Sequence, residues 1–94
     1  MLFRSGGKSA NLICADADFE RAVVDGINDA MRNTGQVCGG LTRMLVPRER
    51  LAEAEALAVQ KAQTYILGDP LDPATNLGPV VTAAARERVR GYIH

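Results

Sequence analysis

The sequence is poor in the residues that build metal sites and disulfide frameworks. Its 94 residues include two cysteines, Cys14 and Cys38, no tryptophan and one histidine, His94. Two cysteines do not make a disulfide framework, and a single histidine leaves no recognisable zinc site, so we expect no metal. A cysteine–histidine hydrolase also has little support, because His94 stands at the last position, far from either cysteine.

An excess of charge of one sign is also missing. The 11 basic and 11 acidic residues balance and are spread along the chain. Without a basic patch or interleaved aromatic residues, we expect no nucleic-acid partner. No apolar run is long enough to cross a membrane, and residues 1–7 lack the apolar core of a signal peptide. These absences favour a reduced, cytoplasmic, soluble protein of at most one small domain.

The first half of the chain alternates between strand and helix patterns. Residues 10–14 form a short apolar run that predicts a buried strand, and residues 41–46 predict a second strand that Pro47 ends. Between them, the spacing of apolar residues predicts a helix near 17–34, with Asp16 as its N-cap. The apolar face of this helix comprises Phe19, Ala22, Val23, Ile27, Ala30 and Met31, and its other side carries Arg21, Asp25, Asp29 and Arg32. This order predicts a βαβ unit whose two strands are parallel neighbours.

The second half predicts two more helices and a loop. An alanine-rich helix near 48–66 is expected to pack its apolar stripe against the sheet. Residues 67–80 contain three prolines and two glycines, so we expect an irregular segment. Thr82 is the expected cap of a helix over 82–93, whose apolar stripe is expected to face partners outside the chain and therefore to be exposed. The predicted fold class is therefore α/β, a βαβ unit with two further helices.

The two cysteines lie in different predicted settings. Cys14 is inside the first strand and is expected to be an inert core residue. Cys38 follows the helix-ending Gly35 and precedes Gly39 and Gly40, a break in regular structure with room for close backbone approach. No base lies within several residues of Cys38, so on these residues alone an inert cysteine is the simpler interpretation.

The segment Gly6-Gly7-Lys8-Ser9 is similar to the end of a phosphate-binding loop. That motif needs another glycine where this chain has Leu2, and it needs a strand before it. We therefore interpret the segment as a flexible turn before the first strand.

Several short motifs together resemble one family. They are Gly-Gly-Lys-Ser-x-Asn at 6–11, Asp-Ala-Asp-Phe-Glu-x-Ala-Val at 16–23, Asn-x-Gly-Gln-Val-Cys at 33–38, Gly-Asp-Pro-Leu-Asp-Pro at 68–73, Leu-Gly-Pro at 77–79 and Arg-Val-x-Gly-Tyr-Ile at 88–93. Each is weak alone, but in this order and spacing the chain resembles the aldehyde dehydrogenases over nearly its whole length. The resemblance implies that the fold is part of their catalytic domain.

The resemblance also implies a reaction and a site. Cys38 would add to the carbon of an aldehyde substrate as a thiolate, and its backbone N–H, with a side-chain amide from elsewhere, would hold the resulting oxyanion. Hydride would pass to NAD or NADP, and water would hydrolyse the thioester to a carboxylic acid. The backbone at Gly6 would lie near the nicotinamide, whereas Gly35 and Gln36 would shape the turn. Complete members of the family are homo-oligomers.

The chain departs from the family pattern just before Gly6. The family has Glu-Leu there, and its glutamate activates water, whereas this chain has Arg4 and Ser5. The cofactor-binding domain is expected to be absent, which makes residues 1–94 an internal piece of the catalytic domain. The alternative is a catalytically inactive truncated product that acts, if at all, as a binding or interaction module.

Overall fold

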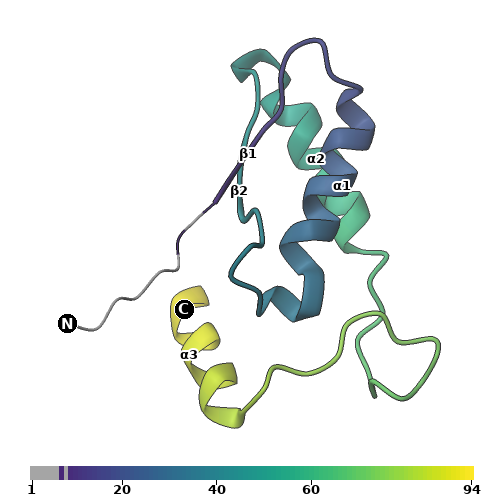
Figure 1. Ribbon diagram of the computed structural model, residues 1–94, viewed down its shortest axis with the longest axis vertical. Coiled ribbons are helices and arrows are strands. Elements are labelled where there is room, and N and C mark those ends of the chain that lie inside the picture. Colours follow the sequence, from purple (N-terminus) through teal and green to yellow (C-terminus); the bar gives the residue numbers. More distant parts are fainter. Residues whose placement is uncertain (1–6, 8) are drawn as a thin grey trace.

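Two short parallel strands lie side by side in the computed structural model, which describes Gly7 and residues 9–94 (Figure 1). Strand β1, Ala10–Leu12, pairs with β2, Arg43–Leu45, in the register Asn11 opposite Met44. The N–H of Ile13 extends the ladder by donating to the carbonyl of Leu45 at 2.9 Å. The predicted parallel pairing of neighbouring strands is confirmed.

Helix α1, Phe19–Met31, makes the crossover between the strands. The predicted N-cap, Asp16, is wrong. The cap is Asp18, whose carboxylate accepts from the N–H of Arg21 at 3.4 Å. The reason is a turn that comes first, in which the N–H of Ala17 donates to the carbonyl of Cys14, so the helix begins only after these residues.

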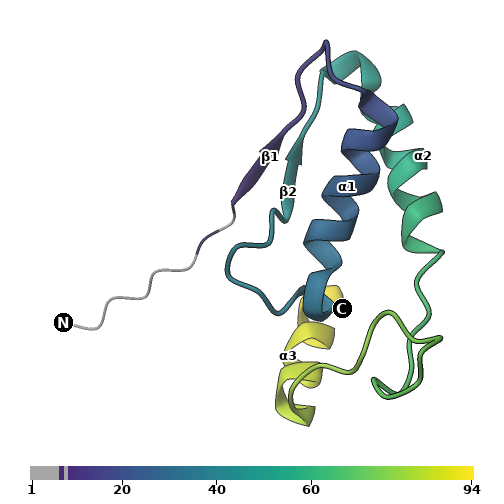
Figure 2. The ribbon, with the colours of Figure 1, turned by 45° about the vertical axis from the view of Figure 1, so that its right-hand side comes forward.

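The core lies between the sheet and two helices. Helix α2, Leu51–Ala62, follows a short 3-10 turn, η2, Arg48–Arg50, and runs beside α1 (Figures 1 and 2). The buried apolar residues are Ile13, Phe19, Val23 and Ala54, and Ala17, Ala22, Met44, Val46, Leu57 and Ala58 pack around them. The stripe of α2 was expected to pack on the sheet, but its main neighbour is α1.

A stacked side-chain group joins the first turns of the two helices. The guanidinium of Arg50 lies 3.6 Å from the centre of the buried Phe19 ring. Its Nε and Nη2 donate to the carboxylate of Glu53 at 2.9 and 2.7 Å. These hydrogen bonds from Arg50 lower the pKa of Glu53. Contact of a planar guanidinium with an aromatic face and a carboxylate fixes the start of α2 over the start of α1.

Glycine lets α1 approach the sheet closely. Gly26 is buried, and a Cβ atom built on it would collide with the ends of the Met44 and Asn11 side chains, one from each strand. The residue that weakens the helix by propensity is therefore the one that faces the strands.

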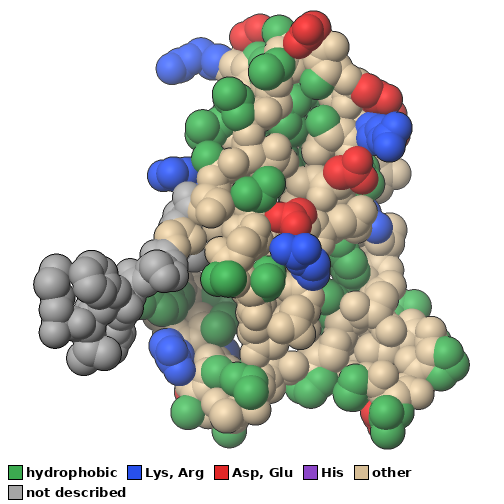
Figure 3. All heavy atoms as spheres, viewed as in Figure 1, with side chains coloured by type: hydrophobic (Ala, Val, Ile, Leu, Met, Phe, Trp, Pro, Cys, Tyr) green, Lys and Arg blue, Asp and Glu red, His purple; other side chains and the backbone are tan. Residues whose placement is uncertain are grey.

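The first strand is not buried as predicted. Leu12 is 69% exposed and Cys14 is exposed, whereas Ile13 between them is 4% exposed. Successive side chains of a strand point to opposite faces, and the helices cover only one face of this sheet. Leu45 is also exposed, and Figure 3 shows apolar side chains at the surface over the strands. Cys14 is thus not the core residue that the sequence predicted.

Residues 67–80 are irregular, as predicted, but they form a closed loop. Leu67 and Leu77 make an isolated parallel bridge, and the side chain of Asn76 accepts from the N–H of Ile66 at 2.6 Å. The hydroxyl of Tyr65 donates to the side chain of Asn28 on α1 at 2.8 Å. Partial burial raises the pKa of Tyr65. The loop is therefore anchored to α1 at its start.

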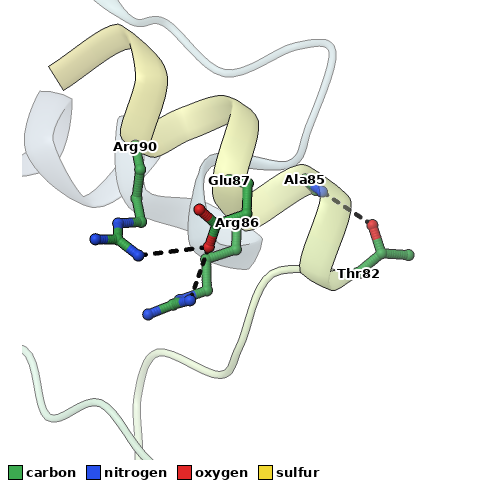
Figure 4. Close-up of polar contacts among 5 residues, drawn as sticks. All are labelled: Thr82, Ala85, Arg86, Glu87 and Arg90. Atoms are coloured by element: carbon green, nitrogen blue, oxygen red, sulfur yellow. Dashed lines mark hydrogen bonds and ion pairs between the residues drawn. The ribbon is translucent and has the colours of Figure 1, made fainter. Parts of the chain in front are cut away.

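Helix α3, Ala83–Ile93, stands apart from the other elements (Figures 1 and 2). The predicted cap is confirmed, since the hydroxyl of Thr82 accepts from the N–H of Ala85 at 3.1 Å (Figure 4). Arg86 and Arg90 both contact Glu87. No residue of α3 is buried, and Tyr92 is 88% exposed. The expected exposed apolar surface is confirmed.

The dimensions of the chain agree with this open arrangement. The radius of gyration is 15.1 Å, whereas a compact domain of this size has about 13 Å. Among the described residues, no helix combines the length and apolar character needed to cross a bilayer.

We predict that Val23→Ala lowers the free energy of unfolding by about 2 kcal/mol, because it removes two methyl groups from a fully buried site and leaves a cavity. Val59→Ala is the matched control, since Val59 is 57% exposed on α2 and should change stability by less than about 0.5 kcal/mol. Urea denaturation followed by far-ultraviolet circular dichroism measures both. Equal losses would show that the core is not centred on Val23.

Candidate active site

The connection between α1 and β2 begins with a left-handed reversal of the chain. The 3-10 segment η1, Arg32–Gly35, contains Asn33 at φ 50°, Thr34 at φ 58° and Gly35 at φ 74°. Left-handed backbone costs L-residues about 1–2 kcal/mol each, and only glycine adopts it freely. The helix was expected to run to residue 34, but α1 ends at Met31 because this reversal replaces its last turn.

Asn33 and Gln36 stabilise the reversal by bonding to each other's backbone. The side-chain amide of Asn33 donates to the carbonyl of Gln36 at 3.1 Å, and the amide of Gln36 donates back to the carbonyl of Asn33 at 3.0 Å. The N–H of Gln36 also donates to the Asn33 carbonyl. The expectation that Gly35 and Gln36 shape the turn agrees with this geometry.

Cys38 occupies the middle of the next turn. The N–H of Gly40 donates to the carbonyl of Val37 at 3.2 Å, so Cys38 and Gly39 are the two central residues. Gly40 is buried, and a Cβ atom on it would stand 3.1 Å from a Val37 methyl. Cys38 is exposed, and its backbone N–H donates to no other described residue. A thiol and an unpaired N–H are thus presented by the same residue.

A carboxylate from α1 fixes the end of this turn. Oδ2 of Asp29 accepts from the N–H of Leu41 at 2.7 Å, and its Oδ1 lies 3.4 Å from Nη2 of Arg32. The same Nη2 would lie 3.9 Å from a Cβ atom built on Gly39. A guanidinium therefore lies beside the turn that carries Cys38. Helical spacing assigned Asp29 and Arg32 only to the side opposite the apolar face and did not show this role.

Two further side chains tie the connection to the segment before α3. The hydroxyl of Thr34 donates to the carbonyl of Gly78 at 2.9 Å. The side-chain carbonyl of Gln36 accepts from the N–H of Val81 at 2.7 Å. A shallow hollow lined by Asn33, Gln36, Pro79 and Val81 lies at this junction. Periodicity and local motifs carry no signal for contacts across this distance in sequence.

The predicted site residues are distributed as follows. Cys38 precedes β2 and Gly7 precedes β1, so both lie toward the N-terminal ends of the two parallel strands. Cys14 follows β1 and therefore lies toward the C-terminal ends of the strands. Gly6, predicted to approach the cofactor, and Arg4 lie outside the described residues.

The described residues form neither a metal site nor a dinucleotide cradle. Within residues 9–94 and Gly7, no three His, Cys, Asp or Glu side chains are grouped to hold a metal. The connection from β1 to α1, residues 13–18, contains no glycine. A dinucleotide-binding loop at that place needs glycines for the tight turn and for close backbone approach to the pyrophosphate. The βαβ unit described here does not fit a bound dinucleotide.

The chain belongs to the aldehyde dehydrogenase family, whose family model matches residues 1–94. It is 46% identical over 88 residues to 3-succinoylsemialdehyde-pyridine dehydrogenase of a Pseudomonas species. The matched region covers 94% of this chain and 18% of that protein. Betaine aldehyde dehydrogenase 1 of Rhizobium meliloti (strain 1021) is 41% identical with the same coverage. The chain therefore spans about one fifth of the length of these relatives.

Solved structures of the family have the same fold over this stretch. Aldehyde dehydrogenase C of Pseudomonas syringae, a mutant in complex with NAD+ and octanal, superposes with a TM-score of 0.91 and 51% identity, covering 94% of this chain and 18% of that one. Betaine aldehyde dehydrogenase of Staphylococcus aureus, in complex with NAD+, has a TM-score of 0.88 and 34% identity with the same coverage. The α/β fold is thus part of the aldehyde dehydrogenase fold.

We predict that Gly35→Ala destabilises the chain by about 1–2 kcal/mol, because alanine must then adopt left-handed backbone. Space is not the cause, since the new Cβ atom would stand 3.8 Å from the carbonyl of Ala30. Gly91→Ala is the matched control in α3, where nothing lies within 4 Å of the new atom, and it should increase helix content. Circular dichroism with thermal melting measures both. Stabilisation by Gly35→Ala would contradict the left-handed reversal.

Proposed function

We propose that this chain is the part of an NAD- or NADP-dependent aldehyde dehydrogenase that supplies the catalytic thiol of Cys38. The observation that carries the proposal is the setting of this residue: an exposed cysteine whose N–H donates to no other described residue, in a turn fixed at both ends. Membership of the family supports it, as does the complex of a related enzyme with octanal and NAD+. The proposed product is the carboxylic acid, reached through a thioester on Cys38.

The chemistry of the first step follows from the residue itself. The thiol loses its proton to solvent, the sulfur forms a bond to the aldehyde carbon, and the carbonyl electron pair moves to oxygen. The N–H of Cys38 is then a donor for the new oxyanion, and one such donor is typically worth about 3 kcal/mol. Arg32, whose Nη2 lies beside the Gly39 position and 3.4 Å from Oδ1 of Asp29, supports the turn that carries the thiol.

The oxidant is assigned to a nicotinamide dinucleotide bound mainly by other parts of the enzyme. The described residues do not fit a dinucleotide cradle, so the only cofactor contact that we assign is the backbone at Gly6. Residues 1–94 are accordingly proposed to belong to the catalytic domain, without the cofactor-binding domain. The whole enzyme is proposed to be a cytoplasmic homo-oligomer.

A second function, as an inactive product that acts as a binding or interaction module, is favoured by one observation. Apolar side chains are exposed on both the sheet and α3, with Leu12 at 69% and Ile93 at 73%. Large exposed apolar surfaces mark binding sites for other protein surfaces. In the enzymatic proposal, the remaining four fifths of the dehydrogenase cover them.

We predict that a chimera separates the two functions. Residues 1–94 replace the matching segment of the Pseudomonas syringae enzyme, and octanal and NAD+ are added. The enzymatic proposal predicts a burst of about one NADH per active site. Cys38→Ser should abolish the burst, whereas Cys14→Ser, which changes the other exposed cysteine, should leave it unchanged. A burst in the Cys38→Ser chimera would contradict the assignment of the thiol.

We predict that Arg4 prevents continued turnover in this chimera. A guanidinium stays protonated at neutral pH and cannot activate water, so the thioester should persist after the burst. Arg4→Glu should restore steady NADH formation by at least about 100-fold, the usual scale of general-base catalysis. Arg4→Gln is the control that removes the positive charge without adding a base. Equal recovery with glutamine would show that charge, and not base catalysis, limits turnover.

A further inference from the structure

Thr34 and Gln36 reach from the cysteine connection to a segment more than forty residues later in the chain. The Thr34–Gly78 bond joins residues 44 apart, and the Gln36–Val81 bond joins residues 45 apart. Val81 directly precedes Thr82, the cap of α3. We call this pair of hydrogen bonds the clamp.

Both polar ends of Gln36 are used. Its oxygen accepts from the N–H of Val81, and its nitrogen donates to the carbonyl of Asn33. The oxygen and nitrogen cannot exchange places, because each then faces a group of its own kind. One side chain therefore joins the left-handed reversal to the segment before α3, two residues from Cys38.

Thr34 shows that the clamp holds an unfavourable backbone. A β-branched residue at φ 58° is a genuine outlier, since such positions cost about 1–3 kcal/mol and persist only where surrounding contacts hold them. The hydroxyl of Thr34 makes the part-buried bond to Gly78 at 2.9 Å. Thr34 and Gln36, the two residues of the clamp, flank Gly35. The clamp therefore holds the end of the reversal from both sides of this glycine.

We infer that Thr34 and Gln36 are positioning residues for Cys38, a conclusion that rests on the proposed function of that thiol. The clamp sets where the reversal ends, and the turn of Cys38 follows immediately. The N–H of Cys38 is useful to an oxyanion only within a few tenths of an ångström of its place, because donor geometry decides the stabilisation. The position of the reacting group thus depends on the segment that leads into α3.

The inference also explains how α3 can influence the site without contacting it. Helix α3 has no extensive contact with any other described element, and one bond of the clamp ends on Val81, the residue directly before the cap Thr82. Whatever covers the apolar face of α3 will therefore act on Gly78–Val81, and through the clamp on the cysteine turn.

Amide hydrogen exchange of the 94-residue chain tests the clamp without any reaction. Gln36→Ala should speed exchange at Val81 by about 10-fold, the value of one hydrogen bond, and should also speed exchange at Gly40, which closes the Cys38 turn. Gln36→Glu keeps an acceptor for Val81 and should protect it, while losing the bond to Asn33. Gln60→Ala, an exposed glutamine on α2, is the control. Unchanged exchange at Gly40 in Gln36→Ala would overturn the inference.

Turnover in the chimera carrying Arg4→Glu then tests positioning. Gln36→Ala should lower kcat by about 10- to 100-fold, the cost of a small misplacement, with KM changed by less than about 3-fold. Thr34→Ser should leave kcat unchanged because serine retains the hydroxyl. Thr34→Val should lower kcat because valine has no hydroxyl. Unchanged kcat in Gln36→Ala, or equal kcat in the two Thr34 variants, would overturn the inference. Activity in Cys38→Ser would instead overturn the proposed function. The hydrogen-exchange result would still decide whether the clamp holds the cysteine turn, because that measurement involves no reaction.

Discussion

The left-handed reversal at Asn33–Gly35 is the constraint on which the candidate site depends. It ends α1, turns the chain back toward β2 and leaves Cys38 in the middle of a tight turn. Its cost of about 1 kcal/mol or more at each non-glycine residue is offset by side chains that satisfy the local backbone. Asn33 and Gln36 bond to each other's backbone, Thr34 bonds to Gly78, and Asp29 holds the N–H of Leu41. The site is therefore built mainly from backbone geometry, with polar side chains as its supports.

Local patterns were enough to predict the order of elements and the parallel pairing. Apolar spacing, turn residues and the crossover rule all act over short distances, and α1, α2, α3 and both strands lie where they indicated. The N-cap was misplaced by two residues because the turn at 14–17 is not visible in periodicity. The burial of Cys14 was wrong because burial depends on what covers each face of a sheet. The roles of Cys38 and Gly6 stay predictions.

The contacts that the sequence could not indicate are the ones that connect the site to the rest of the fold. Asp29 looked like an ordinary polar residue of a helix, and Thr34 was expected to be the last residue of that helix. Their partners, Leu41 and Gly78, are backbone groups, which leave no trace in side-chain composition. Resemblance to a family located the cysteine, but only the geometry showed how its turn is held.

The central claim is that the turn makes Cys38 a more reactive thiol than an ordinary exposed cysteine. The chain contains its own reference, because Cys14 is also exposed but has no such turn. The most direct measurement is the rate of iodoacetamide alkylation at neutral pH, with the two sites resolved by mass spectrometry of the 94-residue chain. We predict that Cys38 reacts about 10-fold faster than Cys14, because it lies in the middle of a tight turn that is held in place and its neighbouring glycines leave room for the reagent. Equal rates, or faster alkylation of Cys14, would contradict the account.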